Sequence, residues 1–344
     1  MQSDFKINSS SNLIYSRKLL RKEKILAYPY HWQVPAKTEN AAYESIMSIG
    51  STTDFEYVGF PWATLIDGLR GDAQSAPELL KALSEIIGIG RNEGVRRVTV
   101  AQHIHAGRFA ELFKSCGITD IFWSHATYDL ENLDGIRVHA FPLFPAQASE
   151  RRPADTFPPR KYLANFIGAY NPNVYLTNVR EAIFADENND GDVLIVKRDV
   201  WHFDRAVYEE QIGGRDALAD RLEIEKMHAR EYLRAIEDSW FTLCPSGSGP
   251  NSIRIFESLC IGSIPIILTR SLKLPGSEIL WKRAALIEDD SVEGYKRAIS
   301  KARNIGFAQR KEMLHAGAEL LKVIHPENYF EIINSAMDFD ANNV

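Results

Sequence analysis

The sequence has little of what a secreted, membrane-spanning or nucleic-acid-binding protein usually carries. Its cysteines are few, and no two of them have metal-ligand spacing, so neither a disulfide framework nor a zinc site is predicted: Cys116, Cys244 and Cys260. No run reaches the ~18 apolar residues that a membrane-spanning helix requires. The net charge of −6 argues against a surface that binds many nucleic-acid phosphates.

The first residues, 1–12, are polar and lack the apolar core of a signal peptide, so we expect a cytoplasmic protein. A basic run over 17–24 is interleaved with Leu19 and Leu20. We interpret this run as the solvated face of a helix. The open alternative is contact with an anionic membrane surface, which would make any membrane association peripheral.

The length of 344 residues favours two domains over one. Short apolar runs rich in β-branched residues alternate with helical patterns, which is typical of parallel sheets built from βαβ units. The predicted strands are Ile25–Tyr28, Phe55–Val58, Val98–Ala101, Ile121–Ser124, Arg137–Ala140, Leu163–Ile167, Asp192–Val196, Phe241–Cys244, Ile264–Leu268 and Ala284–Ile287. The predicted helices include Ala76–Gly88, Gly107–Ser115, Asn178–Phe184, Ala217–Glu237, Ser252–Leu259 and most of 292–337.

A proline-rich segment divides this α/β series. Residues 142–160 contain five prolines and little periodicity, which is typical of an interdomain linker. We therefore predict an N-terminal Rossmann-like domain over 1–150, a C-terminal Rossmann-like domain over 151–325, and a C-terminal helix over 326–344 that packs back on the first domain. Two such sheets would face each other across a cleft, where ligands bind in this architecture.

The most informative stretch is WFTLCPSGSGPNSIRIFESLCIGSIPIIL, which begins at Trp240. Its pattern predicts a strand, a glycine-containing loop, a helix, a glycine turn and a second strand. The start of the helix presents free N–H groups and a positive dipole end, which favour an anion. Gly247 and Gly249 would let the backbone approach a phosphate closely. The loop and helix start supply further candidate ligands to a phosphate: Ser246, Ser248, Asn251, Ser252 and Arg254.

Glu257 follows on the same helix, and an acid beside a phosphate site is repulsive unless it has another role. A carboxylate can accept hydrogen bonds from both hydroxyls of a ribose. An arginine for a diphosphate and an acid for a ribose together describe a nucleotide-diphosphate site. The competing interpretation makes Ser252 an ordinary N-cap and places Arg254 and Glu257 on a solvated helix face.

This stretch resembles the signature of the exostosin family, in which Cys-Pro-x-Gly leads to Ser-x-Arg, then Glu, then Gly-x-x-Pro before a strand. The matching positions are Cys244, Pro245, Gly247, Ser252, Arg254, Glu257, Gly262 and Pro265. Upstream, Phe166-Ile167-Gly168 followed by Arg180 resembles the strand–loop–arginine element of that family, whose arginine is expected to reach the donor phosphates. The resemblance covers about residues 95–275, and it departs from the usual pattern at Ile261 and Ser263.

The resemblance implies an inverting, metal-independent glycosyltransferase of the two-domain GT-B type. Its donor would be a nucleoside-diphosphate sugar, with UDP favoured, and its acceptor a glycan or a lipid-linked glycan. No metal and no cofactor beyond this co-substrate is expected. Animal and plant members carry a membrane anchor that this sequence lacks, which favours a cytoplasmic enzyme of bacterial surface-polysaccharide biosynthesis.

A catalytic base should come from the N-terminal domain, across the cleft. Four residues are candidates for this base: Asp67, which lies in FPWATLIDGLR, and His103, His125 and Asp129, which follow predicted strands. Asp67 could instead be a helix-surface or capping acid, and the two histidines could be buried, hydrogen-bonded core residues. Asp67 and His125 are preferred.

Other motifs point to different chemistry and fit less well. Gly247-x-Gly249-x-x-Ser252 lacks the third glycine and the later acid of a dinucleotide site. Asp190-Gly191-Asp192 has the form of a metal-binding DxD, and the sequence before it mimics the start of a calcium loop, but Lys197 replaces the required glutamate. The pair His103 and His105 lacks an obvious third metal ligand.

Two other functions remain open at this point. A nucleotide-sugar epimerase shares the fold and would accumulate an altered nucleotide sugar without any acceptor. A non-catalytic carbohydrate-binding protein would have no activity that substitutions of Arg254 or Glu257 could remove.

Overall fold

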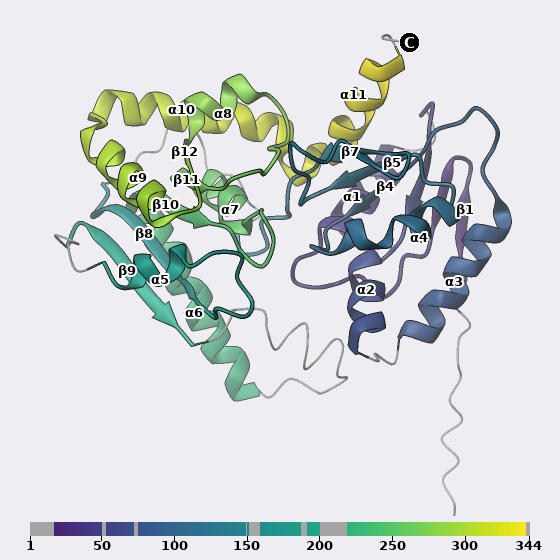
Figure 1. Cartoon of the computed structure of the whole chain (residues 1–344), viewed down its shortest axis with the longest axis horizontal. Helices are drawn as coiled ribbons and strands as arrows, with labels where there is room; N and C mark the ends of the chain where they lie inside the picture. The colour runs from purple at the N-terminus through teal and green to yellow at the C-terminus, as the bar shows by residue number, and fades with distance from the viewer. Residues whose placement is uncertain are drawn as a thin grey trace, which may run out of the picture.

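A computed structural model describes the protein over residues 17–49, 53–71, 75–148, 150, 159–186, 191–199 and 219–341. Figure 1 shows two α/β bodies side by side, with the N-terminal one in purple to blue and the C-terminal one in teal to green. Each contains a largely parallel sheet that helices cover. The predicted fold class, α/β with two Rossmann-like domains of the GT-B type, is confirmed.

Within these residues, the N-terminal sheet has seven strands in the order β1-β2-β3-β4-β5-β7-β6. The predicted strands form its parallel centre, and antiparallel β1 and β6 close its edges. Neither edge strand is predicted from the sequence, because strands of two or three residues show no periodicity. Strand β1 lies in the basic run 17–24, so the interpretation of that run as a helix is wrong. The strands are β1 Leu20–Lys22, β2 Ile25–Ala27, β3 Glu56–Gly59, β4 Arg97–Ala101, β5 Asp120–Trp123, β6 Asn132–Leu133 and β7 Ile136–Ala140.

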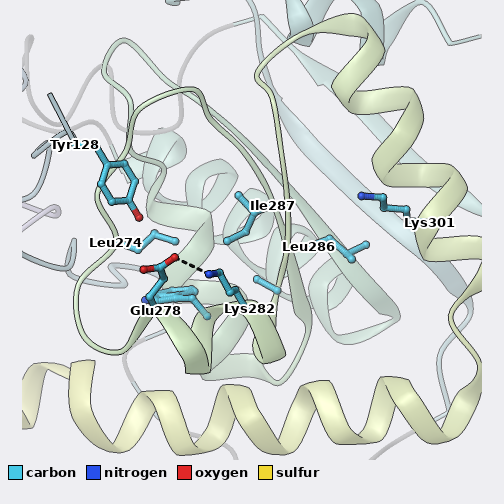
Figure 2. A pocket seen from close by; sticks show the side chains of 9 residues that line it. Tyr128, Leu274, Glu278, Lys282, Leu286, Ile287 and Lys301 are labelled. Carbon is cyan, nitrogen blue, oxygen red and sulfur yellow. Dashed lines mark ion pairs between the residues drawn. The ribbon is translucent and has the colours of Figure 1, made fainter.

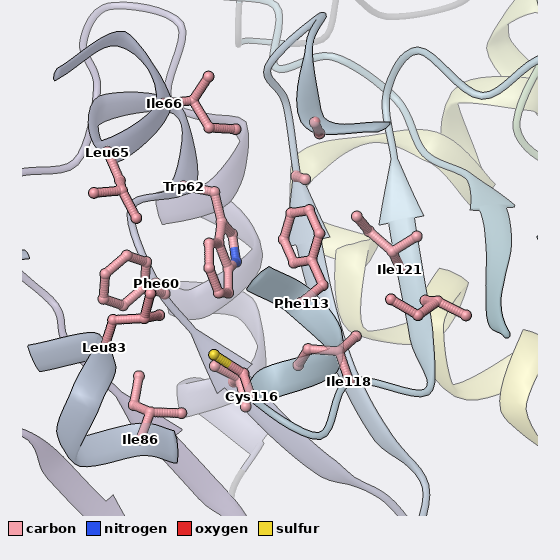
Figure 3. Packing of buried hydrophobic residues seen from close by; sticks show 14 of the residues in the cluster. Phe60, Trp62, Leu65, Ile66, Leu83, Ile86, Phe113, Cys116, Ile118 and Ile121 are labelled. Atoms are coloured by element: carbon pink, nitrogen blue, oxygen red, sulfur yellow. The ribbon is translucent and has the colours of Figure 1, made fainter. Parts of the chain in front are cut away.

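Helices cover both faces of this sheet. Helices α2, α3 and α4 share one core cluster with the strands, and α1 shares the cluster on the opposite face. Figure 3 shows the first cluster, in which the Trp62 ring lies 4.6 Å from that of Phe113 and its Nε1 donates to Thr99 Oγ1 at 2.8 Å. These contacts fix the start of α2 against β4. The helices are α1 Thr38–Ile49, α2 Trp62–Gly71, α3 Ala76–Ile89, the 3-10 turn Ala106–Phe109 and α4 Ala110–Ser115.

The C-terminal sheet, as far as the structure describes the chain, has five parallel strands in the order β12-β11-β10-β8-β9. All five were predicted, with ends shifted by up to two residues. Parallel strands buried on both faces form near-continuous apolar runs, and this makes them readable from sequence. They are β8 Tyr162–Ala169, β9 Val193–Arg198, β10 Ser239–Pro245, β11 Ile264–Leu268 and β12 Leu286–Glu288.

Helices α5 and α9 cover one face of this sheet, and α6, α7 and α8 cover the other. Helix α10 contributes to both clusters. Gly262 ends α7 in the left-handed region at φ 82°, which lets the chain turn directly into β11. The helices are α5 Val179–Phe184, α6 Ala219–Glu237, α7 Ile253–Ile261, α8 Glu278–Ala284, α9 Val292–Asn304 and α10 Phe307–Ile324.

The chain then returns to the first domain. Helix α11, Tyr329–Ala341, packs beside α1 through Phe330 and Ile333, and the Tyr329 ring lies 4.7 Å from that of Phe141. Figure 1 shows this last helix, in yellow, beside the N-terminal sheet. The C-terminal helix therefore belongs to the N-terminal body by its packing.

Within the proline-rich segment 142–160, residues 149 and 151–158 lie outside the described ranges. The first part of the segment packs against the N-terminal domain. Phe144 is buried in the core of the N-terminal domain, and its N–H donates to Thr38 Oγ1 at 2.9 Å. The departure from the first domain thus occurs after this anchored stretch.

Asp120, at the start of β5, is fully buried and binds several cations. It accepts from Arg137 Nε and His139 Nε2, each at 2.9 Å, and from Arg96. Burial alone would raise the pKa of Asp120, but the hydrogen bonds from His139, Arg96 and Arg137 outweigh it and hold the pKa well below its usual range. The carboxylate therefore joins three neighbouring strands at this end of the sheet.

We expect Asp120→Asn to lower the free energy of unfolding by about 3 kcal/mol, because it removes the charge that these cations share. A group with a depressed folded-state pKa stabilises the protein above its unfolded pKa, near ~4, and this contribution is lost below it. The gap between the two proteins in urea unfolding should therefore shrink as pH falls below about 4. Asp54→Asn, at an exposed position, is the control. A gap that persists unchanged at low pH would contradict this account.

Candidate active site

The predicted strand–loop–helix element is present, with loop 246–252 joining β10 to α7 at the carboxyl end of the sheet. Ser252 takes the N-cap position with extended backbone, but its hydroxyl makes no capping bond. The start of α7 therefore keeps free N–H groups. The loop itself turns toward the N-terminal domain.

Two arginines, Arg180 on α5 and Arg254 on α7, converge on the end of β8. We call them the arginine pair. Arg254 Nη2 donates to the Ile167 carbonyl at 2.7 Å, and Arg180 Nη1 donates to the Ala169 carbonyl at 3.1 Å. Between them lies Gly168, where a Cβ would stand 2.8 Å from Arg254 Nη2 and 3.4 Å from Arg180 Nη1. Glycine at this position lets both guanidinium groups approach the strand.

The arginine pair is held by carbonyls and aromatic rings. The guanidinium of Arg180 lies 4.1 Å from the Tyr175 ring centroid, and that of Arg254 lies 5.1 Å from the Phe166 ring centroid. Neither arginine forms an ion pair with a carboxylate in the part of the chain that the structure describes. Burial, and then the charge of Arg254, lowers the pKa of Arg180 to about 9. Two adjacent cations that are not directly ion-paired with a carboxylate make a strong site for an anion.

Several buried polar atoms near loop 246–252 have no hydrogen-bond partner. They are Arg254 Nε, Ser252 Oγ, Asp290 Oδ1 and His125 Nδ1. Leaving such an atom unpaired costs about 1–3 kcal/mol, and folded proteins contain few of them. Their grouping around one loop indicates a site that is built to hold a polar ligand.

The remaining loop residues have mixed placements. Ser246 is buried, and its carbonyl accepts from Arg180 Nε at 3.0 Å. A Cβ at Gly247 would make ordinary van der Waals contact with the Asn251 carbonyl oxygen, 3.7 Å away, and Ser248 is exposed. Asn251 does not face the arginine pair, because its Nδ2 donates to the Ser124 carbonyl at 2.6 Å and so joins the two domains.

Glu257 is completely buried, so the alternative of a solvated helix face is wrong for this residue. Its Oε2 accepts from the Tyr232 hydroxyl at 2.6 Å, and its Oε1 accepts from the Gln147 N–H at 3.0 Å. Burial raises its pKa, although these hydrogen bonds and Arg254 oppose the shift. Both oxygens are already engaged inside the protein, so the carboxylate anchors α6 and the interdomain segment to α7 in this structure.

On the N-terminal side, Asp67 and His103 face each other rather than solvent. Asp67 Oδ1 lies 3.0 Å from His103 Nε2, and Gln33 Nε2 donates to Asp67 Oδ2 at 2.8 Å. His103 Nδ1 accepts from the His105 N–H at 3.0 Å. The interpretation of Asp67 as a surface acid is therefore wrong. Both oxygens of Asp67 and both ring nitrogens of His103 therefore already have a hydrogen-bond partner within the protein.

His125 differs from that pair because its Nδ1 is buried and unpaired. It follows β5 and faces Gly249 of the opposite domain, where a Cβ would stand 2.6 Å from His125 Nδ1 and 2.7 Å from Ile104. Burial, and then His103, lowers the pKa of His125 to about 3, which keeps the ring neutral at ordinary pH. Asp129 lies apart from this group, on an exposed turn where Thr127 binds its carboxylate.

The backbone joins the domains beside these residues. Tyr128 N–H donates to the Ser271 carbonyl at 3.0 Å, and Lys273 N–H donates to the Ala126 carbonyl at 2.9 Å. A cavity of about 420 Å³ opens next to this seam and is shown in Figure 2. Its lining includes Tyr128, Trp281 and Lys282 but no member of the arginine pair, so it is distinct from the site at α7.

Sequence reasoning missed several residues of this region. Asp290 comes to the loop from the end of β12, and Tyr175 and Tyr232 contact the arginine pair and Glu257. Gln33 orients Asp67. None of them belongs to a recognisable motif, and only the folded arrangement brings them to the site.

The metal motifs receive little structural support. The rings of His103 and His105 lie 5.4 Å apart, and among the described residues no three His, Cys, Asp or Glu side chains are grouped to hold a metal ion. Asp190 lies outside the described residues. Asp192 forms an ion pair with Arg303 at 3.0 Å. Of the helices that can be described, none has the length and apolar character to cross a bilayer.

A family model, the exostosin GT47 domain, matches residues 90–296, which is more than half of the chain. The chain belongs to this family. The match contains the predicted span 95–275, the arginine pair and most of the residues that face it. It makes this region of the chain an exostosin-type glycosyltransferase domain.

Curated relatives agree with the family. Exostosin-1 of Mus musculus is 29% identical over 170 residues, which is 46% of this chain and 21% of the mouse protein. The exostosin-1 homolog of Caenorhabditis elegans is 29% identical over 129 residues, covering 37% of this chain and 32% of that protein. The match thus spans a fifth to a third of the length of these relatives.

Solved structures of similar shape include a glycosyltransferase from Rickettsia africae, with a TM-score of 0.45 and 11% identity over 92% of this chain and 96% of that chain. Another is TarM of S. aureus in complex with UDP and sugar ligands, with a TM-score of 0.41 and 10% identity over 86% of this chain and 58% of that one. The low scores mark a general likeness only.

The contact between Gly249 and His125 gives a test of the domain boundary. We expect Gly249→Ala to lower the free energy of unfolding by about 1–3 kcal/mol, because the added methyl overlaps His125 and Ile104. Gly247→Ala is the matched control on the same loop, since its nearest neighbour would be 3.7 Å away. Equal melting temperatures for the two variants would show that the domains do not meet here.

Proposed function

We propose that this protein transfers a sugar, with inversion, from a nucleoside-diphosphate donor to a glycan or lipid-linked glycan in polysaccharide biosynthesis. A UDP-sugar is the favoured donor. The single observation that carries the proposal is the arginine pair beside the N-terminus of α7, in which Arg180 is buried, Arg254 is half-buried, and neither guanidinium is ion-paired with a carboxylate of the described residues. A diphosphate supplies the negative charge and the oxygen acceptors that such a site favours.

The leaving diphosphate would lie against Arg180, Arg254 and the free N–H groups of α7. As the bond between the anomeric carbon and the phosphate oxygen breaks, its electron pair passes to the diphosphate, and these fixed charges stabilise it. The arginines take the part that a divalent cation plays in other glycosyltransferases. We therefore propose transfer without a metal.

We propose His125 as the base, because its Nδ1 has no hydrogen-bond partner and faces Gly249 of loop 246–252. Asp67 and His103, in contrast, are hydrogen-bonded to each other. The imidazole accepts the proton of an acceptor hydroxyl while that oxygen bonds to the anomeric carbon. Its low pKa keeps the ring in the proton-accepting form. The negative charge of a bound donor would raise this pKa and strengthen the base. Asp129 has no part in this proposal.

The proposal includes a cytoplasmic location, where nucleotide sugars are made. The three cysteines suit a reducing compartment, since all are buried and none of them forms a disulfide.

Nucleotide binding tests the donor site. UDP at 100 times its dissociation constant should add about 2.7 kcal/mol of stability in thermal melts, with or without EDTA. Arg254→Ala should abolish this shift, while Arg283→Ala, an exposed residue on α8, should keep it. A shift that appears only with NAD, or only with added divalent metal, contradicts the proposed donor site.

The base has a separate test. His125→Gln should lower kcat about a hundredfold or more while leaving the dissociation constant for UDP unchanged, because it removes proton transfer and not donor binding. His228→Gln, on α6, is the control. Undiminished turnover by His125→Gln would assign the base to another residue. An altered nucleotide sugar that accumulates without any acceptor would indicate an epimerase instead.

A further inference from the structure

A carboxylate that no sequence motif indicated lies beside the proposed diphosphate site. Asp290 comes two residues after the end of β12 and immediately before Ser291, the N-cap of α9. It is 3% exposed. This position at the carboxyl edge of a parallel sheet is where ligand-binding side chains of this architecture gather.

One oxygen of Asp290 is engaged and the other is not. Its Oδ2 accepts from Thr177 Oγ1 at 3.0 Å and from the Ser246 hydroxyl. Its Oδ1 is buried and has no hydrogen-bond partner. The two hydroxyls fix the orientation of the carboxylate, so the free oxygen has a defined position.

Asp290 lies close to the arginine pair but is not ion-paired with it. Ser246 connects the two, because its hydroxyl binds Asp290 while its carbonyl accepts from Arg180 Nε at 3.0 Å. The charge of Arg180 acts to lower the pKa of Asp290, but burial dominates and raises it. The hydrogen bonds and the charge of Arg180 therefore do not fully offset the cost of burying the Asp290 carboxylate.

A carboxylate next to a diphosphate repels it unless the carboxylate accepts a hydrogen bond from another part of the same ligand. In a nucleoside diphosphate, the pentose directly follows the phosphates and presents hydroxyl donors. Glu257, the acid that the sequence pattern suggested for this role, has both oxygens engaged by Tyr232 and Gln147. Asp290 has an oxygen with no hydrogen-bond partner, whereas each oxygen of Glu257 already accepts one hydrogen bond.

We propose that Oδ1 of Asp290 accepts a hydrogen bond from a ribose hydroxyl of the bound nucleoside diphosphate. This inference rests on the proposed function, since it needs the diphosphate to lie against the arginine pair. It makes Asp290 the residue that distinguishes a ribonucleotide donor from inorganic pyrophosphate and from deoxynucleotides.

The test measures dissociation constants of the full chain for UDP, 2′,3′-dideoxy-UDP and pyrophosphate. The wild-type protein should prefer UDP over the dideoxy nucleotide by about tenfold or more, the expected effect of one hydrogen bond to a charged group. In Asp290→Ala this preference should fall below about twofold, because removing the Asp290 carboxylate and removing the ribose hydroxyls eliminate the same hydrogen bond. Pyrophosphate binding should not weaken, since the substitution removes a negative charge.

Two further variants serve as controls: a neighbouring aspartate and a conservative substitution of Asp290. Asp289→Ala, whose side chain is 66% exposed and pairs with Arg297 at 3.3 Å, should keep the full preference. Asp290→Asn preserves the shape of the side chain if Asp290→Ala does not fold, and it should lower the preference at least about threefold.

The outcomes separate the two proposals. If wild-type protein binds UDP and the dideoxy nucleotide equally, or if Asp290→Ala weakens both by the same factor, Asp290 does not bind the ribose and this inference is overturned. In those cases pyrophosphate and UDP still bind, and the proposed donor site stands. If neither binds the wild-type protein, the proposed function fails, and this inference fails with it.

Discussion

The site depends on two like charges that the protein holds together without neutralising them. Arg180 and Arg254 contact carbonyls and aromatic rings, and the geometry at Gly168 lets both reach the end of β8. Holding two guanidinium groups in this way costs free energy, which the lowered pKa of Arg180 reflects. A bound anion would offset that cost. Much of the surrounding structure, from loop 246–252 to the buried carboxylate of Asp290, is arranged around this uncompensated charge.

Much of the fold could be predicted because its signals are local. Buried parallel strands give continuous apolar runs, and each of the ten predicted strands is present in the structure. The edge strands β1 and β6 were missed, since strands of two or three residues are too short to show a periodicity. Residues 20–22 form a strand because they pair with β2, which is a tertiary effect that the basic composition of the segment does not reveal.

Only those site residues could be predicted whose role follows from their position in a sequence motif. A helix start after a buried strand indicated Arg254 and Ser252, and the resemblance added Arg180. Asp290 could not be predicted, because it is distant in sequence and reaches the loop only through the hydroxyls of Thr177 and Ser246. Asp67 and Glu257 showed the opposite difficulty. Their residue types fitted a chemical role, but only the structure shows that their oxygens are already bonded within the protein.

The return of α11 to the first domain has a mechanical consequence. The polypeptide passes between the domains twice, once near residue 150 and again at 325–329, and the second passage ends in a helix embedded beside α1. Two tethers restrict sliding and twisting far more than one tether does. A rotation about an axis through both crossings is the relative motion of the domains that these two connections oppose least.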